Sequence, residues 1–172
     1  MSDKITGTTR ERREILYWLP VILLPVGNII VAFLTSWEMN WRLWAFSLVG
    51  AACEELFFRF FLLRTIFLPR MKPVLAIILV SLLFAGMHLW NLRNGTAISD
   101  TMFQMAFAFC FSIWAGAVTW KTTWIIPFVA HVLLNATAVV ENSWVSAAIG
   151  VIVLIDGIIL MKGDERNEQA EK

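Results

Sequence analysis

The chain has 172 residues, of which 59% are hydrophobic and only 16% are charged, and its mean hydropathy is +0.71. Soluble domains carry about 25% charged residues. A single domain of this length cannot hide so many apolar side chains in its own core, so the composition excludes an ordinary soluble protein and indicates a surface solvated by lipid. The net charge of only +1 gives no reason to expect a nucleic-acid partner.

Six apolar runs are long enough to cross a bilayer, since a spanning helix needs about 20 residues. They lie at residues 15–35, 43–63, 73–90, 101–119, 122–140 and 144–161. The short connections contain turn-forming residues, as in Asn94-Gly95-Thr96. The sequence therefore predicts an all-α fold, a polytopic transmembrane bundle of about six spanning helices with mostly antiparallel neighbours.

The chain divides into a cytoplasmic N-terminal segment (1–14), a transmembrane domain (15–161) and a polar cytoplasmic tail (162–172) that we expect to be disordered. The first apolar run is interpreted as a retained helix, because it is longer than the apolar part of a typical signal peptide and no cleavage motif follows it. Cys53 and Cys110 lie within apolar runs, which predicts buried thiols and no disulfide framework.

Lysine and arginine are distributed unevenly between the two ends of the predicted spans. With the N-terminus in the cytoplasm, eleven of them lie inside and only Arg42 and Arg93 lie outside, Arg59 within a span being left out. The eleven are Lys4, Arg10, Arg12, Arg13, Arg64, Arg70, Lys72, Lys121, Lys162, Arg166 and Lys172. This asymmetry predicts cytoplasmic termini by the positive-inside rule. The small size and short loops favour a multi-pass protein of a prokaryotic plasma membrane.

Charged and polar side chains occur inside three of the runs, where each charge costs about 2.5–3.5 kcal/mol on insertion scales. The second run contains Glu54, Glu55 and Arg59, the third contains His88, and the fifth contains His131 and Asn135. A rise of about 1.5 Å per residue places Glu54, His88, His131 and Asn135 in one slab, roughly 14–22 Å from the inner boundary. Mutual pairing must offset their cost, and a function is the usual reason for keeping them.

Helical spacing indicates which of these groups face one another. Glu55 and Arg59 are four residues apart, so they share a helix face and can pair. Glu54 lies about 100° around the same helix, which leaves it to face the histidines. His131 and Asn135 also share a face, because they too are four residues apart.

Three short motifs, each on a separate predicted span, carry these residues. Residues 54–59 (EELFFR) resemble the EExxxR motif of the CAAX-protease and bacteriocin-processing (CPBP, or Abi) family. Residues 84–88 (FAGMH) resemble its FxxxH motif, and residues 131–135 (HVLLN) resemble its HxxxN motif. The motifs follow the family's order and contain every histidine of the chain. The resemblance covers roughly residues 45–140.

The resemblance implies an intramembrane glutamate endopeptidase that uses neither a cofactor nor a metal. It assigns Glu54 as the general base, His88 to the attacking water, and His131 and Asn135 to the oxyanion. Glu55 and Arg59 would support these groups from behind. The implied substrate is a membrane-associated protein or peptide tail, and eukaryotic relatives cleave prenylated C-terminal tails.

Three other functions remain open at this point. A zinc metalloprotease has plausible ligands in two histidines and a glutamate, although the sequence lacks the HExxH spacing. A non-catalytic immunity or scaffolding protein could keep the same fold. A transporter or proton relay also uses acids and histidines near the midplane, but no repeated halves are visible.

Outside the motifs, Asp156 is interpreted as a packing or snorkelling residue, and the Phe-rich stretch 103–111 as lipid-facing or core packing.

Overall fold

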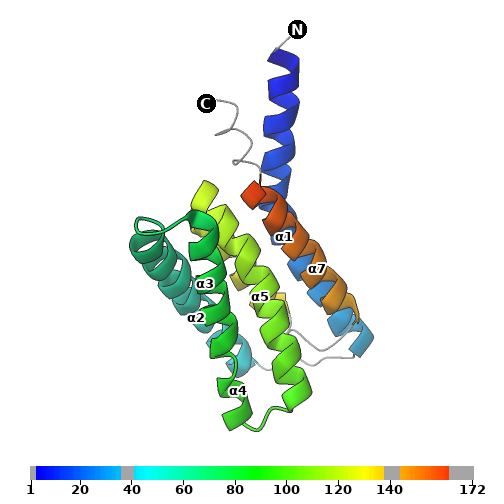
Figure 1. Ribbon diagram of the computed structural model, residues 1–172. Coiled ribbons are helices and arrows are strands. Elements are labelled where there is room, and N and C mark those ends of the chain that lie inside the picture. Colours follow the sequence, from blue (N-terminus) through cyan, green and yellow to red (C-terminus); the bar gives the residue numbers. More distant parts are fainter. Residues whose placement is uncertain (1–2, 36–40, 138–143, 163–172) are drawn as a thin grey trace.

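A computed structural model describes residues 3–35, 41–137 and 144–162 (Figure 1). In chain order the elements are α1 (Asp3–Thr35), α2 (Trp41–Glu55), η1 (Leu56–Phe67), α3 (Pro73–Met87), α4 (Trp90–Arg93), α5 (Ile98–Lys121), α6 (Ile125–Thr137) and α7 (Trp144–Lys162). Every regular element within the described ranges is helical. The predicted all-α bundle is confirmed. Each predicted run overlaps one helical segment when α2 is taken with η1 and α3 with α4.

Within the described ranges, three segments are long and apolar enough to cross a membrane, namely Pro73–Arg93, Ile98–Lys121 and Trp144–Lys162. Glu14–Ile30 and Ile125–Ala136 are shorter apolar helices. The segment formed by α2 and η1 is long, but Glu54, Glu55 and Arg59 interrupt its apolar sequence. These features fit a membrane protein, while the count of six spans stays a prediction.

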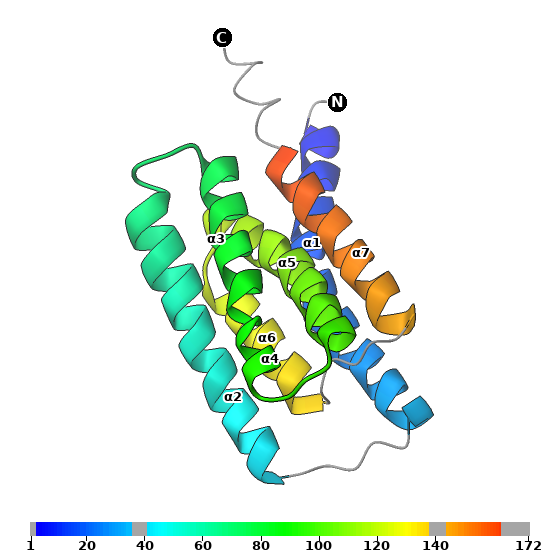
Figure 2. The ribbon, with the colours of Figure 1, turned by 60° about the horizontal axis from the view of Figure 1, so that its bottom comes forward.

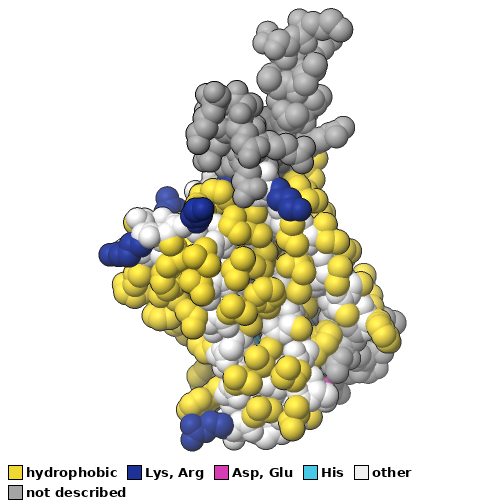
Figure 3. Space-filling model, in the orientation of Figure 1, with side chains coloured by type: hydrophobic (Ala, Val, Ile, Leu, Met, Phe, Trp, Pro, Cys, Tyr) yellow, Lys and Arg dark blue, Asp and Glu magenta, His cyan; other side chains and the backbone are white. Residues whose placement is uncertain are grey.

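Apolar side chains cover much of the face of the bundle that Figure 3 shows. Leu82 and Leu83 of α3 are 55% and 52% exposed, and Ile155 of α7 is 51% exposed. Water would penalise such a surface by about 25 cal/mol for each Å² of apolar area. Lipid removes that cost, because its hydrocarbon tails are as apolar as these side chains.

Helix α5 forms the centre of the bundle, with α3 and α7 packed against it (Figure 2). Helix α6 packs against both α1 and α2, which places it behind α5 in that view. Every residue from 111 to 119 in α5 is buried. Trp114, with no exposed surface, donates a 3.4 Å hydrogen bond from its indole Nε1 to the carbonyl oxygen of Leu16 in α1. The core is therefore organised around α5, which links the two sides of the bundle.

The second predicted span is not a uniform α-helix, because its second half, η1, is a π-helix. A π-helix bonds each N–H to the carbonyl five residues earlier. The N–H of Leu68 continues this pattern by donating to the carbonyl of Leu63 at 2.9 Å. Phe58 and Leu63, five residues apart, are both buried, as is Arg59. The local winding thus turns Arg59 into the bundle together with apolar side chains.

Three expectations for other segments have different outcomes. Helix α1 begins at Asp3, so most of the predicted N-terminal segment 1–14 is helical, in keeping with its content of good helix formers such as Arg and Glu. The expected disorder of the tail falls on residues 163–172, which lie outside the described residues, as do residues 138–140 of the fifth predicted span.

Both cysteines are free, but Cys53 is exposed, so the prediction of a buried thiol was wrong there. Cys53 points away from the bundle because its neighbour Glu55 points into it.

We predict that Gly157→Ala destabilises the bundle. A Cβ atom at Gly157 would lie 2.8 Å from both the backbone N and the Cα of Trp114, and the backbone of a buried helix cannot move aside cheaply. Overpacking of this kind costs about 1–3 kcal/mol. Gly86→Ala is the matched control, because its new methyl group meets nothing within 4 Å. Thermal unfolding in detergent should show a lower Tm for Gly157→Ala only, and equal Tm values would contradict the packing described for α5 and α7.

Candidate active site

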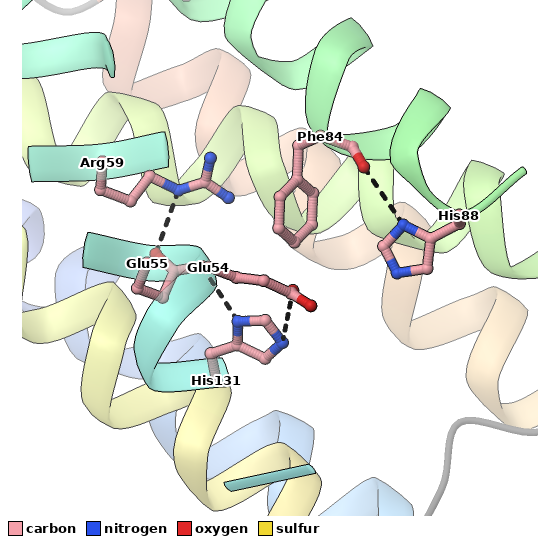
Figure 4. Close-up of polar contacts among 6 residues, drawn as sticks. All are labelled: Glu54, Glu55, Arg59, Phe84, His88 and His131. Carbon is pink, nitrogen blue, oxygen red and sulfur yellow. Dashed lines mark hydrogen bonds and ion pairs between the residues drawn. The ribbon is translucent and has the colours of Figure 1, made fainter. Parts of the chain in front are cut away.

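The carboxylate of Glu55 lies between two basic groups from different helical segments. Its Oε2 is 3.1 Å from Nε of Arg59, and its Oε1 accepts a 3.0 Å hydrogen bond from Nδ1 of His131 in α6 (Figure 4). Glu55 and Arg59 have no exposed surface, and His131 is 7% exposed. The predicted pairing of Glu55 with Arg59 is present. The sequence did not predict the contact with His131, which was expected to face Glu54 alone.

The guanidinium of Arg59 is held by charge and by an aromatic face. Its Nε lies within ion-pair distance of the Glu55 carboxylate, but the alignment is too poor for a hydrogen bond. The N–H groups of Arg59 find no hydrogen-bond acceptor among the described residues. Its Cζ atom lies 4.7 Å from the centre of the Phe84 ring. Such cation–π contacts are worth about 2 kcal/mol or more when they are shielded from water. Phe84 thus stabilises a buried cation that Glu55 only partly satisfies.

Phe84 is the aromatic platform of the site. Its ring centre lies 5.5 Å from that of His88 and 6.0 Å from that of His131, both in edge-to-face geometry. Phe58 packs on it at 5.2 Å. The four-residue spacing of Phe84 and His88 brings this ring against the imidazole of His88, and the ring also contacts Arg59 and His131. A single side chain in α3 sets the spacing of groups from three segments.

The two remaining titratable groups face open space. Glu54 is partly exposed, and its Oε2 lies 4.0 Å from Nε2 of His131. His88 follows the last residue of α3, and its Nδ1 lies 3.1 Å from the carbonyl oxygen of Phe84. A carbonyl oxygen only accepts, so Nδ1 carries the proton, and Nε2 of a neutral His88 is an acceptor. Figure 4 shows the Glu54 carboxylate extending between the two imidazole rings.

A cavity of about 620 Å³ brings the predicted residues together. Its lining includes Glu54, His88, His131 and Asn135, which come from α2, the end of α3, and α6. The other lining residues are Phe46, Gly50, Ala51, Phe84, Asn91, Asn94, Gln104, Phe107, Ala108, Phe111 and Leu134. Glu55 and Arg59 lie behind this wall and do not line it. The arrangement offers a carboxylate, two imidazoles and an amide to one hollow.

Sequence reasoning missed several residues of this cavity. Asn91 donates a 2.7 Å hydrogen bond to Gln104, and both amides line the cavity. Phe111 stacks 5.1 Å from His131, and Phe107 lines the same wall, so the core-packing interpretation of the Phe-rich stretch is correct for these two but incomplete. Gln104 could have indicated this part of the cavity wall, because it is a polar residue within an apolar run.

Asp156 in α7 does not belong to this site. Asp156 does not line the main cavity. It also does not line a smaller hollow of about 340 Å³, which shares Glu54, His88 and Asn91 with the main cavity. Its side chain is 3% exposed, and its oxygens find no hydrogen-bond partner within the described part of the chain. Of the two roles expected for Asp156, packing agrees with this burial, whereas snorkelling was wrong because the carboxyl group does not reach the surface.

The described residues assemble no group of three His, Cys, Asp or Glu side chains able to hold a metal ion. Within the site, Nδ1 of His88 lies against the carbonyl oxygen of Phe84, and Nδ1 of His131 is engaged by Glu55. Each histidine thus has its Nε2 left for the cavity, and the zinc alternative stays open to a chelation experiment.

Comparison with known proteins gives one family match. Residues 35–137 match the family model described as type II CAAX prenyl endopeptidase Rce1-like. The matched range contains α2 to α6 and every residue that the motifs predicted for the site. The match agrees with the resemblance drawn from the three motifs. No curated protein and no solved structure matches the chain.

We predict strong coupling between Glu55 and Arg59. Glu55→Gln leaves Arg59 as an uncompensated buried cation, and breaking a buried pair in this way costs about 3–5 kcal/mol. Arg59→Met leaves the Glu55 carboxylate with only His131. The double variant Glu55→Gln/Arg59→Met removes both charges, so it should unfold at a higher temperature than Glu55→Gln alone. Tm values of the four proteins in detergent form a double-mutant cycle, and additive effects would contradict a direct interaction.

Proposed function

The chain belongs to the Rce1-like family of type II CAAX prenyl endopeptidases, and on that premise we propose that it is an intramembrane endopeptidase with a glutamate-activated water. The observation that carries the proposal is the convergence of Glu54, His88, His131 and Asn135 on one cavity. Its substrate is a membrane-associated protein or peptide tail. We further propose six spans in a prokaryotic plasma membrane with cytoplasmic termini, on the distribution of lysine and arginine.

Both ring nitrogens of His131 face carboxylate oxygens. Nδ1 lies 3.0 Å from Oε1 of Glu55, and Nε2 lies 4.0 Å from Oε2 of Glu54. We infer that the contact with Glu55 orients the ring and that Nε2 is the ring atom that donates into the cavity.

The same geometry prepares a water molecule for attack. A water between Glu54 and His88 donates one hydrogen to the Glu54 carboxylate and the other to Nε2 of His88. As its oxygen bonds to the scissile carbonyl carbon, Glu54 takes the first proton and the carbonyl oxygen becomes an oxyanion. Glu54 then passes that proton to the amine nitrogen as the C–N bond breaks.

The developing oxyanion needs donors on the opposite side of the carbonyl. His131 offers its Nε2–H and Asn135 offers its side-chain amide, and both line the cavity beside Glu54. Preorganised donors in a shielded site act strongly, because they need not reorient as charge develops. Glu55 fixes the orientation of His131 through the 3.0 Å bond to Nδ1. The behaviour of Glu54 variants separates this mechanism from an immunity, scaffolding or transport role.

We predict that Glu54→Gln abolishes peptide cleavage while the protein still folds. Glutamine keeps the size of the side chain but cannot accept the proton, and a general base contributes about 10²–10⁴-fold. The assay uses purified protein in liposomes with a panel of membrane-anchored fluorogenic peptides, both farnesylated and unprenylated. Asp156→Asn is the matched control, because it makes the same carboxylate-to-amide change outside the cavity. Cleavage by Glu54→Gln near the wild-type rate would rule out the glutamate base.

We predict that Asn135→Ala lowers kcat without eliminating cleavage. Loss of one oxyanion donor costs about 2.7–4 kcal/mol of transition-state stabilisation, which corresponds to about 10²–10³-fold. The wild-type protein is assayed in parallel after treatment with a chelator, which should leave its rate unchanged. Activity that falls with the chelator and returns with zinc would favour the metalloprotease alternative. An unchanged kcat for Asn135→Ala would remove its assigned role.

A further inference from the structure

The space beside Glu54 is larger than one attacking water requires. The cavity has a volume of about 620 Å³, whereas a water molecule in the liquid occupies about 30 Å³. Pockets that hold small ligands have volumes of about 300–1,000 Å³ and enclose most of the surface of the bound molecule. The cavity therefore has room for part of a peptide in addition to the water.

One face of α2 leads from the reacting carboxylate into this space. Phe46, Gly50 and Glu54 all line the cavity, and they follow one another at intervals of four residues. Residues four apart lie on the same side of a helix, one turn after another. The three residues thus form a row along the cavity wall. The row is interrupted at its middle position, because Gly50 has no side chain.

The interruption at Gly50 is open space and not packed core. An added Cβ atom at Gly50 would meet no heavy atom of the described residues within 4 Å. At Gly116 and Gly157, an added Cβ atom would lie 2.8 Å from an atom of a neighbouring helix. Close helix packing therefore explains those two glycines but not Gly50. What the missing side chain does at Gly50 is to widen the cavity.

The wall next to this widening is apolar. Ala51 follows Gly50 and is buried, and Leu134 of α6 lines the same cavity. Helix α6 packs against α2, so both helices contribute to this part of the wall. An apolar group gains free energy by leaving water for such surroundings. A charged group would find no partner there to offset the loss of its hydration.

Other parts of the wall suit a peptide backbone. Asn91 in α4 donates a 2.7 Å hydrogen bond to Gln104 in α5, and both side chains line the cavity. A side-chain amide has two N–H donors and a carbonyl acceptor, so this single bond leaves further donors and an acceptor for a ligand. Each peptide unit presents the complementary N–H and C=O groups. Lipid tails have no such groups, so a peptide fits this cavity better than a lipid chain does.

We propose that the space beside Gly50 is a pocket for one apolar side chain of the substrate, and that Gly50 sets the size of the side chain accepted. The proposal rests on the proposed proteolytic function and specifies its substrate class. Gly50 lies four residues from Glu54, which is about 6 Å along the helix axis. An extended peptide advances about 3.3 Å per residue. The substrate therefore carries an apolar residue of about leucine size within about two positions of the scissile bond.

Cleavage of paired peptides by Gly50→Leu tests the pocket. The peptides share one membrane anchor and differ only in having leucine or alanine at one of the two positions on either side of the scissile bond. The wild type should prefer leucine at one of these positions. Gly50→Leu should lower the leucine-to-alanine ratio of kcat/KM there by at least about tenfold, because one methylene in an apolar pocket changes kcat/KM by about 10–200-fold.

Gly86→Leu is the matched control for this variant. An added Cβ atom at Gly86 also meets no heavy atom of the described residues within 4 Å, and Gly86 lies outside the cavity lining. Its peptide preference should equal that of the wild type. An unchanged ratio in Gly50→Leu would overturn the proposal, as would an equal loss of both peptides or the same change in Gly86→Leu. If Gly50→Leu has a lowered Tm, the ratio in Gly50→Ala decides, since this variant adds only one methyl group.

Binding to the inactive protein separates the pocket from the chemistry. Fluorescence anisotropy compares the same peptides on Glu54→Gln and on Glu54→Gln/Gly50→Leu in nanodiscs. The leucine peptide should bind more tightly than its alanine partner to the first protein and lose that advantage on the second. This binding preference together with a wild type that cleaves no peptide would contradict the proteolytic function while supporting the pocket. Equal binding of the two peptides to Glu54→Gln, or binding of neither, would overturn the pocket.

Discussion

The arrangement of the site depends on one buried anion. The carboxylate of Glu55 lies 3.1 Å from Nε of Arg59, which follows it in the same helical segment, and 3.0 Å from Nδ1 of His131 in α6. A single carboxylate therefore connects these two segments. Burying a charge is costly, and only close partners of opposite sign repay that cost. Because Glu55 occupies Nδ1 of His131, the other ring nitrogen faces Glu54 and the cavity. Glu55 therefore fixes the direction of a reacting group that it does not itself expose.

Adjacent glutamates occupy contrasting environments. Glu54 is partly exposed in the cavity wall, whereas Glu55 has no exposed surface and lies behind that wall. A rotation of about 100° between successive helical positions is sufficient to separate them. Phe84 supports both environments, since its ring stacks against Arg59 on one side and its carbonyl oxygen accepts from His88 on the other. An apolar platform beneath charged groups also strengthens their mutual attraction by keeping water away.

Hydropathy and helical spacing predicted much of this arrangement. Apolar run lengths gave the order of helices, and the four-residue spacing of Glu55 and Arg59 gave their pairing. The contact between Glu55 and His131 could not be predicted, because periodicity gives the face of a residue on its own helix but not the rotation of one helix against another. The hydrogen bond between Asn91 and Gln104 could not be predicted for the same reason, although Gln104 itself stands out as a polar residue within an apolar run. The π-helical winding of η1 has no signal in its sequence, because a stretch composed mostly of Phe and Leu offers similar side chains at four-residue and five-residue spacings.

The π-helix has a consequence for how the sequence can change in length. Residues 56–67 keep Phe58, Arg59 and Leu63 inward by bonding across five positions rather than four. Removing one residue downstream of Arg59 would rotate the rest of the segment by about 100° relative to α2. Leu63 would then leave the core, and a neighbour such as Arg64 would move toward it. Insertions and deletions should therefore be rare between Glu55 and Pro69 among natural relatives, even where individual side chains vary freely.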